Sequence, residues 1–479
     1  MKKSLLLLIL FLVPYVYAQE IILNGTISAE NNQIKNLADP TEAQDAVTRA
    51  YIESIEDQLR QLNEILKNSG QINDDIISNI PIASNAYFGD IIVTSDNHFV
   101  LIYTAYNDVN DRDLFVTKLD QNKKELWTKN YGSNNTDLGF GVVEKNDKTG
   151  FIIIGRVQEA SKNVSQIKGQ SDVWVAEINN DGVLIKERTF GGSNAEWPTK
   201  IIKTNETYTV LAKSDSYGGD VTATYDGTNI WIFEIDANFD LIKEKTFGTH
   251  GADEAKDIVF NAPNTLFIGA NIDRADMDVS EYFGGGDIWV ASVDWETTSI
   301  NWEKTIGDSR NDNLKSLHIV DDFIYVSGWK TYENYVAGVL YNISIVGGVL
   351  SNEKFEFGDM NFSSWFSSII SDDQNNLYLA GLKSLTGFYS STQNNSFGGS
   401  DIVVLKLDNE LNILWEKVFG GSGEEPIVTG SHNGTKLVLN NHNLFMFSQV
   451  NSSDKNFELP FVSNGSQIRS VWLTEIKND

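Results

Sequence analysis

Two short segments of the chain gather side-chain oxygens in a pattern that could hold a metal ion. The first contains Asp108, Asn110 and Asp113, and the second contains Asp273, Asp276 and Asp278. Ca²⁺ takes roughly six to eight oxygen ligands, so calcium is the cofactor that these segments would suit. Arg112 stands in the first segment where a ligand belongs, and neither segment has the glycine of a sharp calcium loop. A solvated acidic loop is the competing interpretation of both segments.

Residues suited to acid–base or nucleophilic chemistry are present, but their spacing singles out no catalytic site. A Gly-x-Ser-x-Gly elbow needs a strand followed by a helix, which the β-rich pattern of this chain does not offer. A glycosidase needs two carboxylates across a cleft, and the 66 Asp and Glu residues cannot be paired from sequence. The sequence therefore predicts no catalytic and no cofactor-binding residue. The histidines are scattered without metal-ligand spacing: His98, His250, His318, His432 and His442.

Glycine-rich turns recur along the chain, and their backbone amides could cradle an anion. No basic residue follows them as in a phosphate-binding loop, and their flanks are typical of strands. We therefore expect these glycines to supply positive φ angles in turns. The turns are Phe190-Gly191-Gly192-Ser193, Phe283-Gly284-Gly285-Gly286, Phe397-Gly398-Gly399-Ser400 and Phe419-Gly420-Gly421-Ser422.

The chain is strongly acidic, with 37 Lys and Arg against 66 Asp and Glu and a formal net charge of -29. Nucleic-acid binding depends on neutralising phosphates, and anionic membranes attract basic segments, so neither partner is expected. The charge is typical of a solvated surface that keeps a protein soluble. Binding of divalent cations is the alternative interpretation.

Residues 1–18 have the three parts of a secretory signal peptide. Lys2 and Lys3 form the basic start, residues 5–13 the apolar stretch, and Val16-Tyr17-Ala18 the cleavage site. The apolar stretch is shorter than a membrane-spanning helix requires, so no membrane span is expected. We predict export through the Sec pathway to the periplasm, the cell surface or the medium. The chain has no Cys, which excludes disulfides and thiolate metal sites.

Residues 19–50 carry the string Ala38-Asp39-Pro40-Thr41-Glu42-Ala43-Gln44-Asp45-Ala46. This string resembles the neck element of phage tail fibres and of many exported Bacteroidetes proteins, where it leads into a trimeric coiled coil. Residues 51–68 then show heptad spacing at Ile52, Ile55, Leu59, Leu62 and Leu66. We predict a neck in residues 19–50 and, in residues 51–68, a coiled-coil stalk that forms a homotrimer. A single amphipathic helix packed on its own domain is the alternative.

From about residue 75 to residue 479, one short strand pattern recurs seven times at intervals of roughly 50 to 70 residues. Such a period is typical of propellers and other repeat arrays. Alternating apolar residues and turns of Asn, Asp and Gly favour strands over helices. We predict an all-β fold, a seven-bladed β-propeller of four-stranded blades behind an N-terminal helical coiled-coil stalk. The copies start at Asp113, Asp172, Asn229, Asp287, Tyr335, Asp401 and Ser470.

Several details of this propeller stay open at the level of sequence. We expect the recurrent strand to be the fourth of each blade, after strands such as Trp302-Glu303-Lys304 and Trp415-Glu416-Lys417. Residues 76–82 either begin the first blade or close the ring beside the last one. The fifth blade has the weakest pattern, so six or eight blades are the competing counts.

Three turns place an Asp after a strand and a Trp at the start of the next strand, ending at Trp127, Trp302 and Trp415. This layout resembles the repeats of quinoprotein-like (PQQ-type) propellers and the delta-60-type repeats of exported bacterial proteins. The resemblance implies the propeller fold, with each Trp buried between blades. It does not imply the quinone cofactor, because the usual Thr-Gly pair and the vicinal cysteines are missing.

These observations predict an exported, non-enzymatic binding or adhesion protein that presents a propeller on an oligomeric stalk. The ligand would be a glycan or a protein, bound by variable insertions such as residues 214–228, 384–395 and 450–467, expected between third and fourth strands. The alternative is a carbohydrate-active or quinoprotein-like enzyme with its site at the mouth of the propeller channel.

Overall fold

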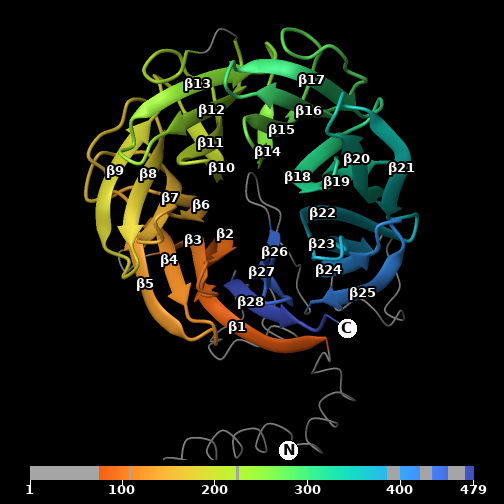
Figure 1. Ribbon diagram of the computed structural model, residues 1–479, viewed down its shortest axis with the longest axis horizontal. Helices are drawn as coiled ribbons and strands as arrows, with labels where there is room; N and C mark the ends of the chain where they lie inside the picture. Colours follow the sequence, from red (N-terminus) through yellow and green to blue (C-terminus); the bar gives the residue numbers. More distant parts are fainter. Residues whose placement is uncertain are drawn as a thin grey trace, which may run out of the picture. The chain divides into compact units, whose positions relative to one another are not determined.

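The computed structural model describes residues 75–106, 111–222, 226–385, 400–420, 434–450 and 470–478. The regular elements in these residues are β-strands, which form seven antiparallel sheets of four strands each. The sheets stand around a common centre like the blades of a propeller (Figure 1), so the predicted seven-bladed fold is confirmed. The predicted signal peptide, neck and coiled coil lie outside the described residues and stay predictions. No described helix is long and apolar enough to cross a membrane.

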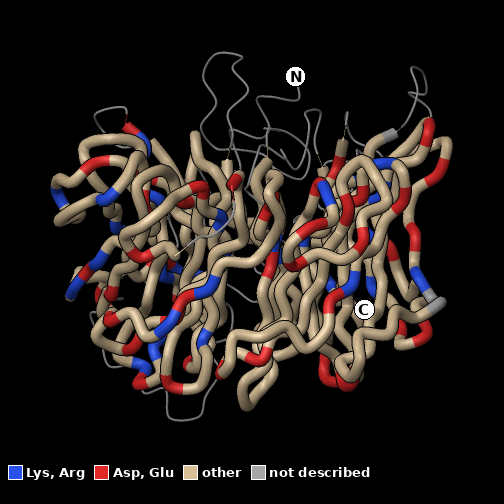
Figure 2. The backbone as a smooth tube through the Cα atoms, turned by 90° about the horizontal axis from the view of Figure 1, so that it is seen from above, with Lys and Arg blue, Asp and Glu red and all other residues tan. Residues whose placement is uncertain are grey.

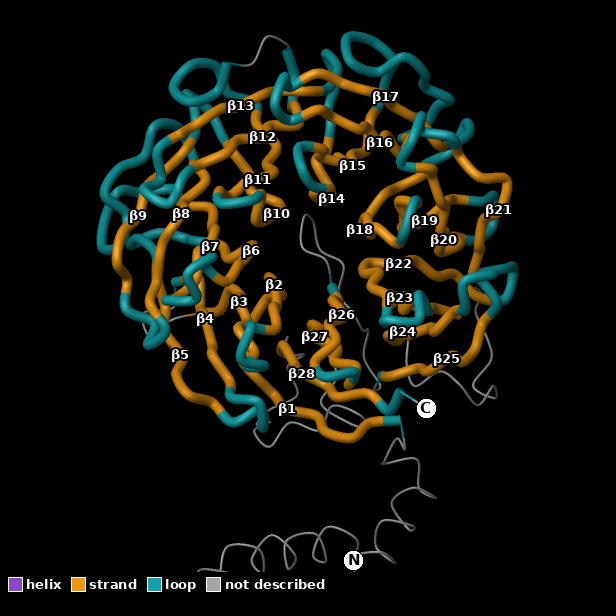
Figure 3. The backbone as a smooth tube through the Cα atoms, in the orientation of Figure 1, coloured by secondary structure: helices purple, strands orange, loops and turns teal. Residues whose placement is uncertain are grey.

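In blades 1 to 6, four consecutive strands run from the centre of the ring to its rim (Figures 1 and 3). Blades 1 to 3 contain β2 (Ala86–Val93), β3 (Phe99–Tyr106), β4 (Arg112–Leu119) and β5 (Glu125–Tyr131); β6 (Leu138–Glu144), β7 (Gly150–Val157), β8 (Asp172–Asn179) and β9 (Leu184–Phe190); and β10 (Glu196–Thr204), β11 (Thr207–Ser214), β12 (Asn229–Ile235) and β13 (Leu241–Phe247). Blades 4 to 6 contain β14 (Glu254–Asn261), β15 (Thr265–Ile272), β16 (Asp287–Asp294) and β17 (Ser299–Ile306); β18 (Asp312–Val320), β19 (Phe323–Thr331), β20 (Val336–Ser344) and β21 (Leu350–Phe357); and β22 (Phe362–Ser371), β23 (Leu377–Leu385), β24 (Ser400–Leu407) and β25 (Ile413–Phe419).

Blade 7 joins the two ends of the described chain. It consists of β26 (Thr435–Asn440), β27 (Asn443–Val450), β28 (Ser470–Ile476) and, as its outer strand, β1 (Ile76–Ser84). Ile80 is paired with Leu473, and Thr474 Oγ1 donates a hydrogen bond of 2.6 Å to Asn79 Oδ1. Of the two arrangements considered for residues 76–82, ring closure beside the last blade is therefore the correct one. The pairing covers the backbone edge that β28 would otherwise leave open.

The order of strands within a blade corrects one prediction from the sequence. The recurrent strand that starts at Asp172 in blade 2 or Asp287 in blade 4 is the third strand, and the strand containing Trp302 is the fourth. The long insertions therefore connect second strands to third strands. A chain of repeated hairpins does not by itself show which four consecutive strands make up one blade. The pairing of β1 with blade 7 settles this grouping, because it makes β2 the first strand of blade 1.

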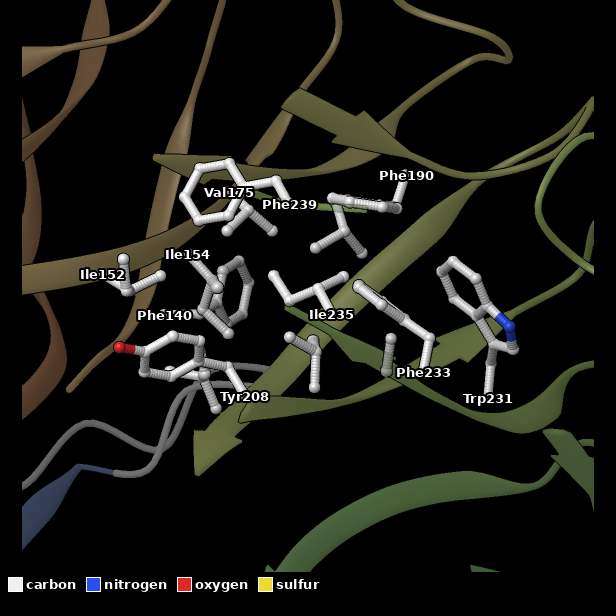
Figure 4. Close-up of a cluster of buried hydrophobic side chains, with 14 of the residues drawn as sticks. Phe140, Ile152, Ile154, Val175, Phe190, Tyr208, Trp231, Phe233, Ile235 and Phe239 are labelled. Atoms are coloured by element: carbon white, nitrogen blue, oxygen red, sulfur yellow. The ribbon is translucent and has the colours of Figure 1, made fainter. Parts of the chain in front are cut away.

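Apolar side chains fill the space between neighbouring blades. Between blades 2 and 3, the ring centroids of Phe190 and Phe233 lie 4.9 Å apart, and those of Trp231 and Phe233 lie 4.4 Å apart (Figure 4). The indoles of Trp174, Trp231 and Trp289, all from third strands, are fully buried. This packing holds each blade against the next and fixes the positions of the connections at the two ends of the ring.

The tryptophans that open outer strands join neighbouring blades, although they are half-buried and not largely buried as expected. Trp127 Nε1 donates to Asn180 O at 2.9 Å, and Trp302 Nε1 donates to Ile345 O at 3.0 Å, in each case on the next blade. Each ring also rests on a glycine of that blade: a Cβ atom on Gly348 would lie 2.6 Å from the ring of Trp302. The predicted role between blades is therefore correct, but the degree of burial is not.

Candidate binding site on the loop-bearing face

One end of the ring carries the connections that vary most in length. Inner strands begin there and second strands end there, because adjacent strands are antiparallel. We call this end the loop-bearing face. In blade 4 the connection of residues 273–286 folds over the turn of residues 248–253, and Asp278 Oδ2 accepts a hydrogen bond of 3.1 Å from Gly248 N. The turns on this face are thus held by side chains of the next blade.

The residues predicted as metal ligands serve this local structure where the structure describes them. Asp273 Oδ2 accepts from Ala252 N at 3.3 Å, and Asp276 Oδ1 accepts from His250 N at 3.0 Å. Asp113 is buried and accepts from Asn130 Nδ2 at 2.7 Å. Among the described residues, no group of three or more His, Asp or Glu side chains is arranged to hold a metal ion. Asp108 and Asn110 lie outside the described residues.

Buried acidic residues stand at four junctions between blades, each at the start of an inner strand or directly before it. They follow a glycine by five residues, a spacing that sequence reasoning missed. Each lies beside an Asp or Asn at the first or second position of the third strand in the preceding blade, as Glu196 lies beside Asp172 and Asp312 beside Asp287. The four are Asp137, Glu196, Asp253 and Asp312, all at most 1% exposed.

Burial shifts the pKa values of these carboxyl groups far upward. It raises the pKa of Asp137 and of Glu196 to about 7, and the neighbouring carboxylates of Asp113 and Asp172 act in the same direction. It also raises the pKa of Asp253 and of Asp312 to about 6. Paired carboxyl groups with separated pKa values are a mark of acid catalysis. Because these groups are buried, no substrate reaches them, and their role is at the blade junction.

The prediction that the glycine-rich turns need positive φ holds for Gly284 and Gly285, with φ of 120° and 70°. It is wrong for Gly191, whose φ is not positive. That position needs glycine because a Cβ atom would collide with the carboxylates of Asp172 and Glu196. Close approach of the buried acids, and not backbone conformation, explains this glycine.

Four cationic side chains from four successive blades gather near the inner strands of the loop-bearing face. Arg156 and Lys213 lie near the ends of the second strands β7 and β11. Lys256 and Lys315 occupy β-bulges of the inner strands β14 and β18, where the extra residue re-aims its side chain. Asp and Glu outnumber Lys and Arg by 66 to 37 and are scattered over the edge-on view of the ring in Figure 2, so a local group of cations departs from the general charge of the chain.

Trp197 holds two of these cations in place. The Arg156 guanidinium carbon and the Lys213 Nζ each lie 4.8 Å from the centroid of its ring, within the range of cation–π attraction. Thr104 and Asn271, at the position equivalent to Arg156, accept hydrogen bonds from a backbone N–H of the next inner strand. At the corresponding position beside Arg156 stands Pro198, which has no N–H. The Arg156 side chain instead lies over Trp197 and donates a hydrogen bond of 2.9 Å from Nε to Ser171 Oγ.

Glu254 is surrounded by the lysines. Its Oε2 lies 2.5 Å from Lys256 Nζ. Burial would raise the pKa of Glu254, but the charges of Lys256, Lys213 and Lys315 together lower it. One carboxylate therefore faces three ammonium groups. We call Arg156, Trp197, Lys213, Glu254, Lys256 and Lys315 the cationic cluster.

Lys315 is the buried lysine of this cluster that has no close acidic partner in the described part of the chain. It is 8% exposed, and its ammonium makes no hydrogen bond or ion pair with another described residue. Its pKa is lowered to about 8, mainly by burial and also by the charge of Lys256, while the charge of Glu254 opposes both. A mostly covered amine without a close anion leaves room for an anion from outside the chain. Sequence reasoning missed the cluster, since its cations come from four different blades.

No family model matches the chain, and no curated protein matches its sequence. Among solved structures, the chain is similar to the acylaminoacyl peptidase of Pyrococcus horikoshii, with 11% identity and a TM-score of 0.38, over 76% of this chain and 49% of that one. An ACO/RPE65 chimera shows 8% identity and a TM-score of 0.37, over 67% of this chain and 70% of that one. The chain thus spans about half the length of the peptidase. Likenesses this distant say nothing about the activity of the chain.

Proposed function

We propose that the protein is an exported, non-enzymatic binding or adhesion protein that presents its propeller on an oligomeric stalk. Its ligand, a glycan or a protein, docks on the loop-bearing face over the cationic cluster. Secretion and the stalk rest on the patterns in residues 1–68. The site rests on the geometry of blades 2 to 5.

The observation that carries this proposal is the imbalance of charge in the cationic cluster. Three lysine ammonium groups act on Glu254, and Arg156 lies beside Lys213 over the Trp197 ring, inside a chain of net charge -29. Burial of the Lys315 ammonium and, to a smaller extent, the like charge of Lys256 cost free energy, and the lowered pKa of Lys315 reflects this cost. An interaction with a ligand would offset this cost, whereas the stability of a blade gains nothing from it.

A glycan and protein array probed with the full chain tests the proposal, run with and without Ca²⁺. The expected result is a defined set of ligands whose signal is lost in an Arg156→Met/Lys213→Met double variant. Lys383→Met serves as the matched control, because Lys383 is paired with Glu416 at 2.6 Å in blade 6. A ligand set that the double variant keeps in full would place binding elsewhere and contradict the proposed site.

A further inference from the structure

We infer that the ligand of the cationic cluster is an acidic saccharide, held through carboxylate groups of uronic-acid type by Lys315, Lys256 and Lys213. This inference rests on the proposed function and adds the chemical class of the ligand. Lys256 and Lys315 leave equivalent bulges of the inner strands β14 and β18, and β14 packs against both β18 and β11, the strand that carries Lys213. The three lysines therefore come from adjoining strands around Glu254, where an external carboxylate can meet them.

The depth of the site favours a small anionic group. Lys315 is 8% exposed, so only a compact group such as one carboxylate reaches its ammonium. Lys256 Nζ is already 2.5 Å from Glu254 and Lys213 Nζ lies over the Trp197 ring, which leaves Lys315 as the lysine of the cluster without a partner among the described residues. A carboxylate that entered would gain a charge-assisted hydrogen bond from the Lys315 ammonium and the attraction of the neighbouring lysines.

The surroundings favour a saccharide over an acidic protein. The connection that follows Lys213 presents Tyr217, which is 48% exposed, on the same face. An exposed aromatic ring offers an apolar surface that suits a sugar ring, and the Tyr217 hydroxyl is held by donating to Asp226 Oδ1 at 3.1 Å. An acidic protein surface would have to approach a chain of net charge -29, and juxtaposed like charges cost several kcal/mol. A short saccharide meets the local cations and little of the acidic surface.

Titration calorimetry of the full chain with trigalacturonate, and with its neutral methyl ester as matched probe, tests the inference. The acid is expected to bind at least tenfold more tightly than the ester. Raising the pH from about 7 to about 9 is expected to weaken binding of the acid, because burial lowers the pKa of Lys315 to about 8. Equal affinity for acid and ester would overturn the acidic class, while binding of either at the cluster would still support the proposed function.

Two variants test the same point in opposite directions. Lys315→Met keeps the length of the side chain and is expected to weaken binding of trigalacturonate about tenfold. Glu254→Gln removes the competing carboxylate and is expected to tighten binding severalfold, a gain that an unfolded variant cannot mimic. Lys436→Met, at an inner strand of blade 7 where Lys436 pairs with Asp90, is the control without effect. The inference would be overturned if Glu254→Gln bound trigalacturonate more weakly than the wild type does, or if the wild type did not bind it at all. It would also be overturned if the wild type bound a poly-glutamate peptide more tightly than trigalacturonate.

Discussion

The carboxyl groups of Asp172 and Glu196 converge on Gly191 at the junction between blades 2 and 3. A Cβ atom on Gly191 would collide with Asp172 Oδ1 and with Glu196 Oε2. Asp172 Oδ2 accepts a hydrogen bond from Lys168 N at 2.5 Å, Oδ1 is buried, and the carboxyl groups of Asp172 and Glu196 are hydrogen-bonded to each other. Two carboxylates in this position cannot both ionise without strong repulsion, so they share a proton. The junction is therefore a site where protonation and blade packing are linked.

The buried acids make the stability of the propeller depend on pH. A carboxyl group whose pKa is raised in the folded state contributes stability that is fully present below its unfolded pKa and is lost as pH rises through the folded value. For Glu196 and Asp137 that window runs from the ordinary values of 4.5 and 3.8 up to about 7. The thermal midpoint is therefore expected to fall between about pH 5 and pH 8 in differential scanning calorimetry. A midpoint that rises over this range would contradict the assignment.

Asp172→Asn is expected to stabilise the protein at pH 8 by roughly 1 to 3 kcal/mol, because the amide can donate to Glu196 where two carboxylates now repel. One junction further on, an amide already stands where blade 2 has Asp172, because Asn229 and the buried Asp253 both lie beside Gly248. Asn229→Asp is the matched reverse change and is expected to destabilise at pH 8 and to steepen the pH dependence. Urea unfolding at pH 5 and pH 8 measures both effects. Equal effects of the two substitutions at both pH values would refute the shared proton.

Ring closure by β1 can be tested with a single engineered disulfide. Asn79 and Thr474 are paired across β1 and β28, and the chain has no native Cys. Oxidised Asn79→Cys/Thr474→Cys is expected to gain roughly 4 to 5 kcal/mol over its reduced form, since the bond closes a loop of almost the whole described chain. Mass spectrometry shows whether the bond forms within one chain. Two thiols that stay free under oxidising conditions would mean that β1 does not lie beside β28.

The buried tryptophans of third strands should matter more for stability than those of outer strands. Trp289 is fully buried, so Trp289→Ala is expected to cost roughly 3 to 5 kcal/mol. Trp302 is half-buried, and Trp302→Ala is expected to cost about 2 kcal/mol, from lost packing on Gly348 and the lost hydrogen bond to Ile345. Urea unfolding measures both. The opposite ranking would show that the outer strands, and not the blade interiors, hold the ring together.

The repeated strands made the propeller fold predictable from the sequence. The position of the recurrent strand within its blade, third or fourth, was not predictable. Strands starting at Asp172 and Asp287 share one pattern because each fills the middle of a blade, with apolar neighbours on both sides. Whether such a strand is third or fourth depends on which strand lies at the rim of the last blade. That depends on the pairing of Ile80 with Leu473, which are almost as far apart in sequence as the chain allows. Local patterns carry no information on such a contact.

The candidate site was largely hidden from sequence reasoning for a related reason. Acidic clusters such as Asp273 and Asp276 attract attention as neighbours in sequence, yet their oxygens are used by backbone amides of an adjacent turn. Arg156 and Lys315 become part of one site only because blades 2 to 5 follow one another around the ring. One local signal was available: Pro198 removes the N–H that a polar side chain from blade 2 would otherwise bind.

The central claim is that ligands bind at the cationic cluster, and hydrogen exchange of the full chain with and without trigalacturonate tests it most directly. Protection is expected in peptides that cover the start of β10, the end of β11 and the bulge of β14, and a Lys315→Met variant is expected to lose it. The turns of residues 120–124 and 236–240, at the opposite end of the ring, serve as internal reference because they lie away from the cluster. Protection confined to those turns, or equal protection in Lys315→Met, would contradict the claim.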